Sequence, residues 1–302
     1  MTPTKFNAKK SHSLIERVIE AGLFSSGILS ILITLAVLAI LSSGVIAFFS
    51  EVSLWDFFGD TQWSPLFSQK HFGIWPLVSG TILVTIIAIS IAVPFGVLAA
   101  VYLSEFAQGK IRKVIKPTLE VLAGIPTIVY GYFALVFVTP LLQKAIPVLA
   151  GFNALSPGLV MGIMILPMIS SLSEDAIHSV SGSLKEGSYA LGASKLSTLF
   201  RVTIPTAFSG IMASVILAVS RAIGETMIVS IAAGQQPTLT TNPLVPVETM
   251  TSYIVQVSMG DTPAGTVEYR TIFVVGSMLF LMTFVMNLLS QKLVRRFRGN
   301  NV

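Results

Sequence analysis

Two opposite charges, Arg221 and Glu225, stand in the middle of a long apolar segment of this chain. A charge at the centre of a lipid bilayer costs about 2.5 kcal/mol or more, so such residues are usually paired or face an aqueous cavity. On a continuous helix, residues four apart lie on one face and can touch. A guanidinium binds a tetrahedral oxyanion through two hydrogen bonds, and a neighbouring carboxylate can release that anion by competing for the arginine. The pair is therefore either an anion path or gate, or a self-satisfied ion pair that fixes helix packing.

Three polar residues of the preceding sequence are weaker candidates for the same path. Glu120 stands near the start of another apolar segment, where a carboxylate can extend to the membrane surface. Thr127 and Tyr130 follow it within the same segment. Their hydroxyl groups could line a path or form hydrogen bonds between helices, and the sequence leaves both interpretations open.

The composition indicates that these residues belong to a membrane protein. Hydrophobic residues make up 53% of the 302 residues and charged residues 11%, whereas soluble domains have about 25% charged residues. Each apolar run is long enough to cross a hydrocarbon layer that needs about 20 helical residues. Backbone groups cannot stay unpaired in lipid, so runs of this length are helices and not barrel strands. The sequence predicts an all-α membrane protein with six transmembrane helices, near residues 22–49, 74–104, 117–143, 153–173, 207–234 and 270–291.

The distribution of lysine and arginine predicts the orientation. Four of these residues precede the first apolar run, four lie in 105–116, three lie in 174–206 and four follow the last run. The intervening loops contain only Lys70, Lys144 and Arg270. Basic residues gather on the cytoplasmic side, so both termini and the 174–206 loop are expected in the cytoplasm.

The ends of the chain fit this orientation. Residues 1–21 are expected to form a cytoplasmic tail whose last part, 13–21, lies on the membrane surface as an amphipathic helix. The run 22–49 is too long for the apolar part of a cleaved signal peptide and is taken as the first transmembrane helix. Residues 292–302 form a basic cytoplasmic tail, and residues 74–291 form the core of the protein.

Two polar segments are expected on the outer side. Residues 50–73 are rich in aromatic side chains, including Trp55 and Trp63, with Trp75 just beyond. They form either an interfacial aromatic belt or a cap that contacts a partner. Residues 235–269 are rich in Pro, Thr and Gly and too polar for lipid, so they are expected to form an outer loop or a contact surface.

The cytoplasmic loop 174–206 has the pattern of a short helix, a glycine, a second amphipathic turn and a proline stop. This is the pattern of a docking element. Its spacing resembles the "EAA" loop of ABC-transporter permeases, through which a membrane subunit holds its cytosolic ATPase. The residues expected to couple the two subunits are Glu186, Gly187, Ala190, Leu191, Gly192 and Pro205.

The resemblance extends over about residues 74–291. The runs Phe95–Glu105, Leu122–Gly131 and Arg221–Met227 are similar to those of the PstC-type permeases of bacterial phosphate ABC importers. The resemblance implies a type I ABC importer permease fold in the bacterial inner membrane. It also implies a homologous PstA-like permease, a PstB-like ATPase dimer that uses ATP and magnesium, and a periplasmic PstS-like phosphate-binding protein.

Several functions have no support in the sequence. There is no G-x-x-x-x-G-K-[ST] motif, so the chain is not expected to be an ATPase, and no cofactor is expected on it. Three scattered histidines and no cysteine give no metal site, and the basic charge needs no nucleic acid. A permease for sulfate or molybdate remains an alternative. A secondary transporter or channel that works alone is disfavoured by the docking loop and the lack of inverted repeats, and an intramembrane enzyme is a weaker alternative still.

Overall fold

The computed structural model describes the backbone of residues 14–298 and the side chains of residues 16–292. The described chain is helical, with two isolated bridges, Trp63 to Phe72 and Gly234 to Val247. The helices are α1 (Leu14–Phe49), α2 (Leu54–Gly59), α3 (Trp75–Val101), α4 (Gly109–Gly124), α5 (Thr127–Phe133), α6 (Thr139–Ala145), α7 (Leu155–His178), α8 (Gly182–Ala190), α9 (Lys195–Thr198), α10 (Ile204–Ile223), α11 (Met227–Ala232), α12 (Met250–Met259) and α13 (Val267–Arg298). Three π-helical turns, Tyr102–Phe106, Ala134–Val138 and Leu199–Thr203, join some of them.

The six predicted membrane helices are confirmed as segments of sufficient length and apolarity. They span Glu16–Phe49, Trp75–Phe106, Thr127–Ala145, Leu155–His178, Lys195–Ile223 and Val267–Lys292. Helices of this length satisfy their own backbone groups, which lipid cannot do.

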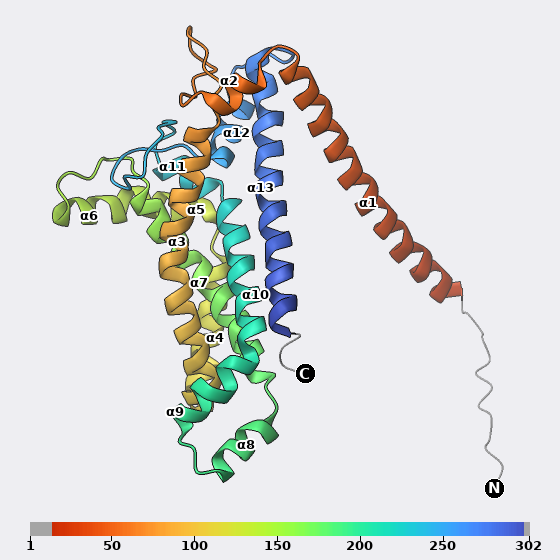
Figure 1. Ribbon diagram of the computed structural model, residues 1–302, viewed down its shortest axis with the longest axis vertical. Helices are drawn as coiled ribbons and strands as arrows, with labels where there is room; N and C mark the ends of the chain where they lie inside the picture. The colour runs from red at the N-terminus through yellow and green to blue at the C-terminus, as the bar shows by residue number, and fades with distance from the viewer. Residues whose placement is uncertain (1–13, 299–302) are drawn as a thin grey trace.

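The core of the molecule is a bundle of α3, α7 and α10 with α13 beside it (Figure 1). The closest packing is between α3 and α7, where small residues let the backbones approach. A Cβ on Gly162 would lie 2.8 Å from the Ala88 carbonyl oxygen, and a Cβ on Gly158 would lie 2.7 Å from a carbon of Ile87. Lipid is as apolar as a side chain, so helices in a membrane associate through close packing of this kind.

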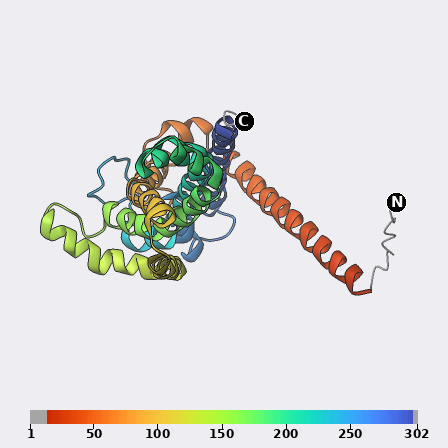
Figure 2. The same cartoon turned by 90° about the horizontal axis from the view of Figure 1, so that it is seen from below.

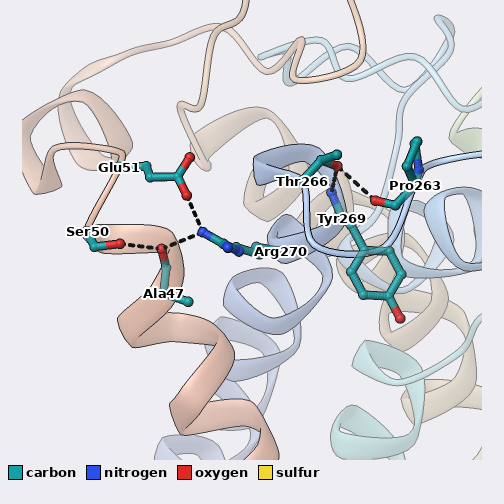
Figure 3. A network of polar contacts seen from close by, with 7 residues as sticks. All are labelled: Ala47, Ser50, Glu51, Pro263, Thr266, Tyr269 and Arg270. Atoms are coloured by element: carbon teal, nitrogen blue, oxygen red, sulfur yellow. Dashed lines mark hydrogen bonds and ion pairs between the residues drawn. The ribbon is translucent and has the colours of Figure 1, made fainter.

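Helix α1 leaves this bundle and diverges from it along most of its length (Figures 1 and 2). It packs on α13 near its outer end, where a Cβ on Gly44 would overlap the Phe273 ring. At the same end Arg270 of α13 donates a hydrogen bond to the Ala47 carbonyl oxygen at 3.2 Å and pairs with Glu51 (Figure 3). The remaining apolar surface of α1 is exposed and available to lipid or to another subunit.

Two membrane segments are interrupted where the sequence predicted continuous helices. The expected helix at 117–143 is divided at Pro126, which lacks the N–H that a continuing helix needs. The chain on the amino side forms α4, and α6 on the other side points sideways out of the bundle (Figures 1 and 2). The expected helix at 207–234 is divided at Gly224, which follows α10. Both breaks lie inside apolar sequence, where hydropathy alone does not reveal them.

The expected surface helix at residues 13–21 is not a separate element. Residues from Leu14 onward belong to α1, which continues without a break to Phe49. The reason is local: residues 14–21 contain neither proline nor glycine, so nothing ends the helix before the apolar run begins. Residues 1–13 of the predicted tail lie outside the described part of the chain.

The outer cap is a folded unit in which the three tryptophans differ. Trp55 is 86% exposed, whereas Trp63 is 3% exposed and packs edge-on against Tyr253 of α12. Trp75 donates a hydrogen bond from Nε1 to the Phe58 carbonyl oxygen at 2.6 Å. An interfacial belt thus describes Trp55 but not Trp63, which is a core residue.

The expected outer loop 235–269 is only partly a loop. Its residues 247–253 are buried in the protein, and α12 packs against α3 and α13. Polar backbone in this segment is tolerated because it finds protein partners: the Met250 N–H donates to Thr81 Oγ1 of α3 at 3.0 Å.

We expect Gly162→Leu to disrupt the bundle, because its side chain would meet the α3 backbone at Ala88. The thermal unfolding midpoint of the purified protein in detergent should fall by several degrees or the protein should not accumulate. Gly22→Leu is the matched control, since nothing lies within 4 Å of a Cβ built there. Equal behaviour of the two variants would contradict the close-packing role.

Candidate functional site

A cavity of about 350 Å³ lies between α4, α7 and α10. It brings together Arg221 and Glu120, two of the predicted path residues, which are distant in the sequence. Lys116 of α4 and Glu174 of α7 also line it. The cavity therefore combines two cations and two carboxylates within an otherwise largely apolar wall.

Glu174 is the most deeply buried charged group at this cavity, with 0% exposure. Its Oε1 lies 2.5 Å from Arg112 Nη2 and its Oε2 lies 3.1 Å from Lys116 Nζ. Lys116 also lies 3.6 Å from Asp175 Oδ1. Burial by itself lowers the pKa of Lys116, but the hydrogen bond and charge of Glu174, with those of Asp175, outweigh it and raise that pKa. Lys116 is therefore charged at neutral pH, and this cluster attaches α4 to α7.

Arg221 and Glu225 do not share a helix face, which corrects the expectation from their spacing. α10 ends at Ile223, and the i to i+4 rule applies only within one helix. Glu225 Oε1 instead accepts hydrogen bonds from the backbone N–H groups of Met227 at 3.1 Å and Ile228 at 3.4 Å. In the part of the chain that the structure describes, no ion pair or hydrogen bond joins Arg221 to Glu225.

Glu225 occupies a structural position at the break between α10 and α11. Its carboxylate satisfies N–H groups at the first turn of α11, and it is 9% exposed. Its backbone carbonyl accepts a hydrogen bond from Thr251 Oγ1 of α12 at 2.7 Å. Glu225 thus links the end of the α10 segment to the outer segment that contains α12.

The two hydroxyl candidates lie outside the residues that line the cavity. Tyr130 is buried and donates its hydroxyl hydrogen to the Leu122 carbonyl oxygen at 2.8 Å, across the break between α4 and α5. It therefore holds the broken segment together. Thr127 begins α5 and is half-buried.

The 174–206 segment forms the expected exposed helix and glycine turn. Gly192 has φ +81°, its N–H bonds to the Tyr189 carbonyl at 2.9 Å and the Ala193 N–H bonds to the Ser188 carbonyl at 3.2 Å. This pair of bonds is a Schellman ending, which favours glycine in the left-handed position. The six predicted coupling residues are all exposed: Glu186, Gly187, Ala190, Leu191, Gly192 and Pro205.

Pro205 does not end a helix, contrary to the expectation. It lies in the first turn of α10, within a helical run from Lys195 to Ile223. The π-helical turn Leu199–Thr203 precedes it, and the backbone hydrogen-bond pattern changes within this turn.

Helix α8 is attached to the chain that follows α3. Lys185 of α8 lies 2.5 Å from Glu105 Oε1, and the Lys195 ammonium lies 4.6 Å from the centre of the Phe106 ring. Ser188 and Thr198 also share a hydrogen bond of 2.8 Å, which joins α8 to α9. These contacts connect α8 to the end of the α3 segment.

Sequence reasoning missed Arg112, Lys116 and Glu174 as parts of the site. It assigned all three to cytoplasmic loops because they flank apolar runs. The available signal was the polar sequence at residues 170–175, with three serines and two acids on a helix that continues to His178. Among the described residues, no group of three or more His, Asp or Glu side chains could hold a metal ion.

We expect Glu174→Gln to loosen α4, because it leaves Arg112 and Lys116 without their buried counter-charge. Both cations are about a third exposed, so water screens part of the lost interaction. The substitution should therefore cost about 2 kcal/mol, which is about thirtyfold in the equilibrium for local opening of α4. Limited trypsin digestion would measure it as faster cleavage within α4. Asp175→Asn is the control: this acid is 64% exposed and should have little effect.

Comparison with known proteins gives the family of this chain. Residues 92–299 match the family described as "Binding-protein-dependent transport system inner membrane component". The chain is 36% identical over 245 residues to the probable ABC transporter permease protein YqgH of Bacillus subtilis, covering 81% of this chain and 79% of the relative. It is 30% identical over 295 residues to the phosphate transport system permease protein PstC of Haemophilus influenzae, covering 91% and 92% respectively.

Solved structures confirm the fold. A bacterial ABC transporter for import of the acidic polysaccharide alginate matches with a TM-score of 0.62 at 15% identity, covering 94% of this chain and 98% of that one. The MetNI methionine ABC transporter in an inward-facing conformation matches with a TM-score of 0.54 at 17% identity, covering 74% and 94%. The architecture is that of a type I ABC importer permease. The chain belongs to the family of binding-protein-dependent transport system inner membrane components.

Proposed function

We propose that this chain is the PstC-type permease subunit of an ATP-driven importer that moves inorganic phosphate from a periplasmic binding protein into the cytoplasm. The observation that carries the proposal is the match to PstC over nine-tenths of both chains. A permease subunit provides the path and is not itself the enzyme. The family match also disfavours a channel or transporter that works alone.

The orientation follows from charge and from shape. In Figure 1 the beginning of α1 and the end of α13 are the lower ends of these helices, and α8 lies at the lower end of the molecule. The segments at these ends are the ones in which the sequence concentrates lysine and arginine. We therefore assign this side to the cytoplasm of a bacterial cell. The cap and α12 then face the periplasm, and the membrane is the inner membrane.

Exposed apolar residues support an ATPase partner, which we take to be a PstB-like dimer, at the cytoplasmic end. Leu184 and Tyr189 of α8 are 49% and 42% exposed, and Leu191 is 90% exposed. Leu184 and Tyr189 lie on α8 and Leu191 directly follows it, and α8 protrudes beyond the bundle (Figure 1). A protruding apolar surface of this kind is typical of a contact with another protein. Binding of ATP and magnesium, and ATP hydrolysis, belong to that partner.

A second, PstA-like permease fits the open side of the cavity. Helix α4, which forms one wall, has no buried residue in this chain. Helix α1 is 6% buried along its most apolar window. A homologous subunit would cover these surfaces and close the cavity around an anion.

Arg221 is the residue that we assign to phosphate during transit. It lines the cavity with Lys116, and a guanidinium binds a phosphate through two charge-assisted hydrogen bonds. Glu120 and Glu174 provide negative charge at the same cavity, which keeps the anion from being held too tightly. Glu225 acts indirectly in this scheme, by holding the break after α10. The same chemistry suits sulfate or molybdate, so transport competition by these anions tests the substrate.

We expect Gly192→Ala to weaken ATPase association, because a Cβ at a positive φ costs about 1 kcal/mol or more. Gly192→Asn separates the causes, since asparagine tolerates the left-handed region. Retained association and transport with Asn, but not with Ala, would show that backbone conformation matters. Loss with both would show that the ATPase surface excludes a side chain. Wild-type behaviour of both variants, and of Gly192→Asp, would contradict the coupling role.

We expect Arg221→Gln to abolish or strongly reduce transport while the complex still assembles. The measurement is phosphate uptake into proteoliposomes that contain the complex, with ATP inside and the loaded carrier outside. Uptake is normalised to assembled complex, and unlabelled sulfate and molybdate are added as competitors. Arg221→Lys keeps the charge but loses the two-pronged geometry, so partial activity would indicate an electrostatic role.

Lys113→Gln is the matched control, because Lys113 is exposed on α4 and does not line the cavity. Normal uptake per complex by Arg221→Gln would exclude the anion-handling role. Uptake without ATP or without carrier would exclude the proposed importer.

A further inference from the structure

A second cavity, of about 140 Å³, lies at the outer end of the molecule between the cap and α12. Trp63 and Phe67 of the cap line one side, and Glu248, Tyr253 and Gln256 line the other. Phe67 is 70% exposed, so the cavity reaches the outer surface. The fold places it at the opposite end of the bundle from the docking helix α8 (Figure 1).

Glu248 is a buried acid at this cavity. The residue is 1% exposed, and its Oε1 has no hydrogen-bond partner among the described residues. The backbone of Glu248 packs directly against α3. A Cβ built on Gly80 of α3 would overlap the Glu248 carbonyl oxygen. A buried carboxyl group without a partner is costly, so its retention at a cavity points to a ligand.

The basic groups near the cap are already engaged with other acids. Lys70 pairs with Glu268, and His71 lies 2.7 Å from Asp60. Arg270 pairs with Glu51, as Figure 3 shows. Among the described residues that line the cavity, Glu248 and Tyr253 are the titratable ones and none is a cation.

The remaining lining residues include groups that can contact a cation. Gln235, Gln236 and Gln256 can offer amide oxygens, and the Phe67 ring can offer its negative face. Once Glu248 is ionised, an oxyanion would meet a negative charge without a compensating cation among the described lining residues. An ammonium or guanidinium group would satisfy that carboxylate and place its apolar stem against the aromatic rim.

We propose that this cavity is a receptor for one basic side chain, lysine or arginine, of the soluble carrier protein that docks on the outer face. The inference rests on the proposed function, which supplies such a carrier. A pocket that takes one extended basic side chain matches the cavity in size and chemistry, and buried pairs of this kind contribute strongly to docking.

The cavity is connected to the break beside the transport path. Glu248 is followed directly by the buried segment in which Met250 bonds to Thr81 of α3 and Thr251 bonds to the Glu225 carbonyl. Occupation of the cavity by the carrier therefore acts on the residues that hold α10, α11 and α3 together. This gives the carrier a physical route to the membrane helices.

Docking should depend on pH through the same group. Burial raises the pKa of Glu248 to about 8, so in the empty cavity it is mostly protonated at neutral pH. A cation binds the ionised form. Carrier affinity should therefore rise with pH, by up to about tenfold per unit below pH 8, and level off above it. Tyr253, the other titratable lining residue, has its pKa raised further from neutrality by burial, so it stays neutral in this range.

The test measures binding of phosphate-loaded carrier to the assembled complex in nanodiscs, at several pH values and fixed ionic strength. Glu248→Gln mimics the protonated residue and should assemble normally. It should bind the carrier about tenfold or more weakly at pH 8 and lose the pH dependence. Asp261→Asn is the matched control, because it removes an exposed acid from the same face without touching the cavity. It should retain the wild-type pH dependence.

A second variant and a small probe remove the remaining ambiguity. Gln256→Lys supplies a cation from the chain itself, so it should also abolish the pH dependence and should raise thermal stability at neutral pH. Methylguanidinium should compete with the carrier for the wild-type complex, whereas sodium at the same concentration should not.

Wild-type affinity and pH dependence in Glu248→Gln would overturn the proposal and leave a cavity that holds only water. Stabilisation of the isolated wild-type complex by methylguanidinium, together with unchanged carrier affinity in Glu248→Gln, would overturn the carrier side chain and assign the cavity to free cations. Failure of the carrier to bind the wild-type complex at any pH would instead refute the proposed function.

Discussion

Close contact between the backbones of α3 and α7 is the interaction on which the rest of the structure depends. Helices in lipid gain no hydrophobic free energy by associating, so they need surfaces that fit closely. Gly158 and Gly162 provide such a surface against Ile87 and Ala88. The other elements are arranged on this pair: α10 packs against both helices, and α4 attaches to α7. The cavity that contains Arg221 is the space left between α4, α7 and α10.

Two broken helices lie next to this cavity, and each break has a defined physical cause. Pro126 ends the hydrogen-bond pattern between α4 and α5, and Tyr130 compensates through its bond to Leu122. Gly224 follows α10, and Glu225 compensates by accepting N–H groups of α11. Broken backbone inside a membrane is tolerated where protein groups satisfy it. Such points are where a transport path can change shape without unfolding a whole helix.

Two of the buried acids, Glu174 and Glu248, lie at opposite ends of the described chain and differ in their partners. Glu174 has two cations of α4 as partners and therefore fixes one helix to another. Glu248 has none among the described residues and faces a cavity that is open to the outside. The first arrangement is complete within the subunit, whereas the second becomes complete when another molecule supplies the positive charge. The two ends are also linked to the bundle by different contacts. At one end Lys185 of α8 pairs with Glu105 after α3, and at the other Thr251 of α12 donates a hydrogen bond to the Glu225 carbonyl oxygen.

The sequence by itself determined the six membrane segments and the short exposed helix that ends before Gly192. These features depend on local sequence. A membrane segment is recognised by the length and apolarity of its own residues, and a glycine after a short helix is a common signal for the end of that helix. The tertiary structure alone decided that Glu225 turns away from Arg221, that Glu174 is buried and that Trp63 is a core residue. Each of these outcomes depends on where a helix breaks and on which neighbour then faces the side chain. Contacts between residues distant in the chain are not encoded in any local pattern, so spacing alone could not supply them.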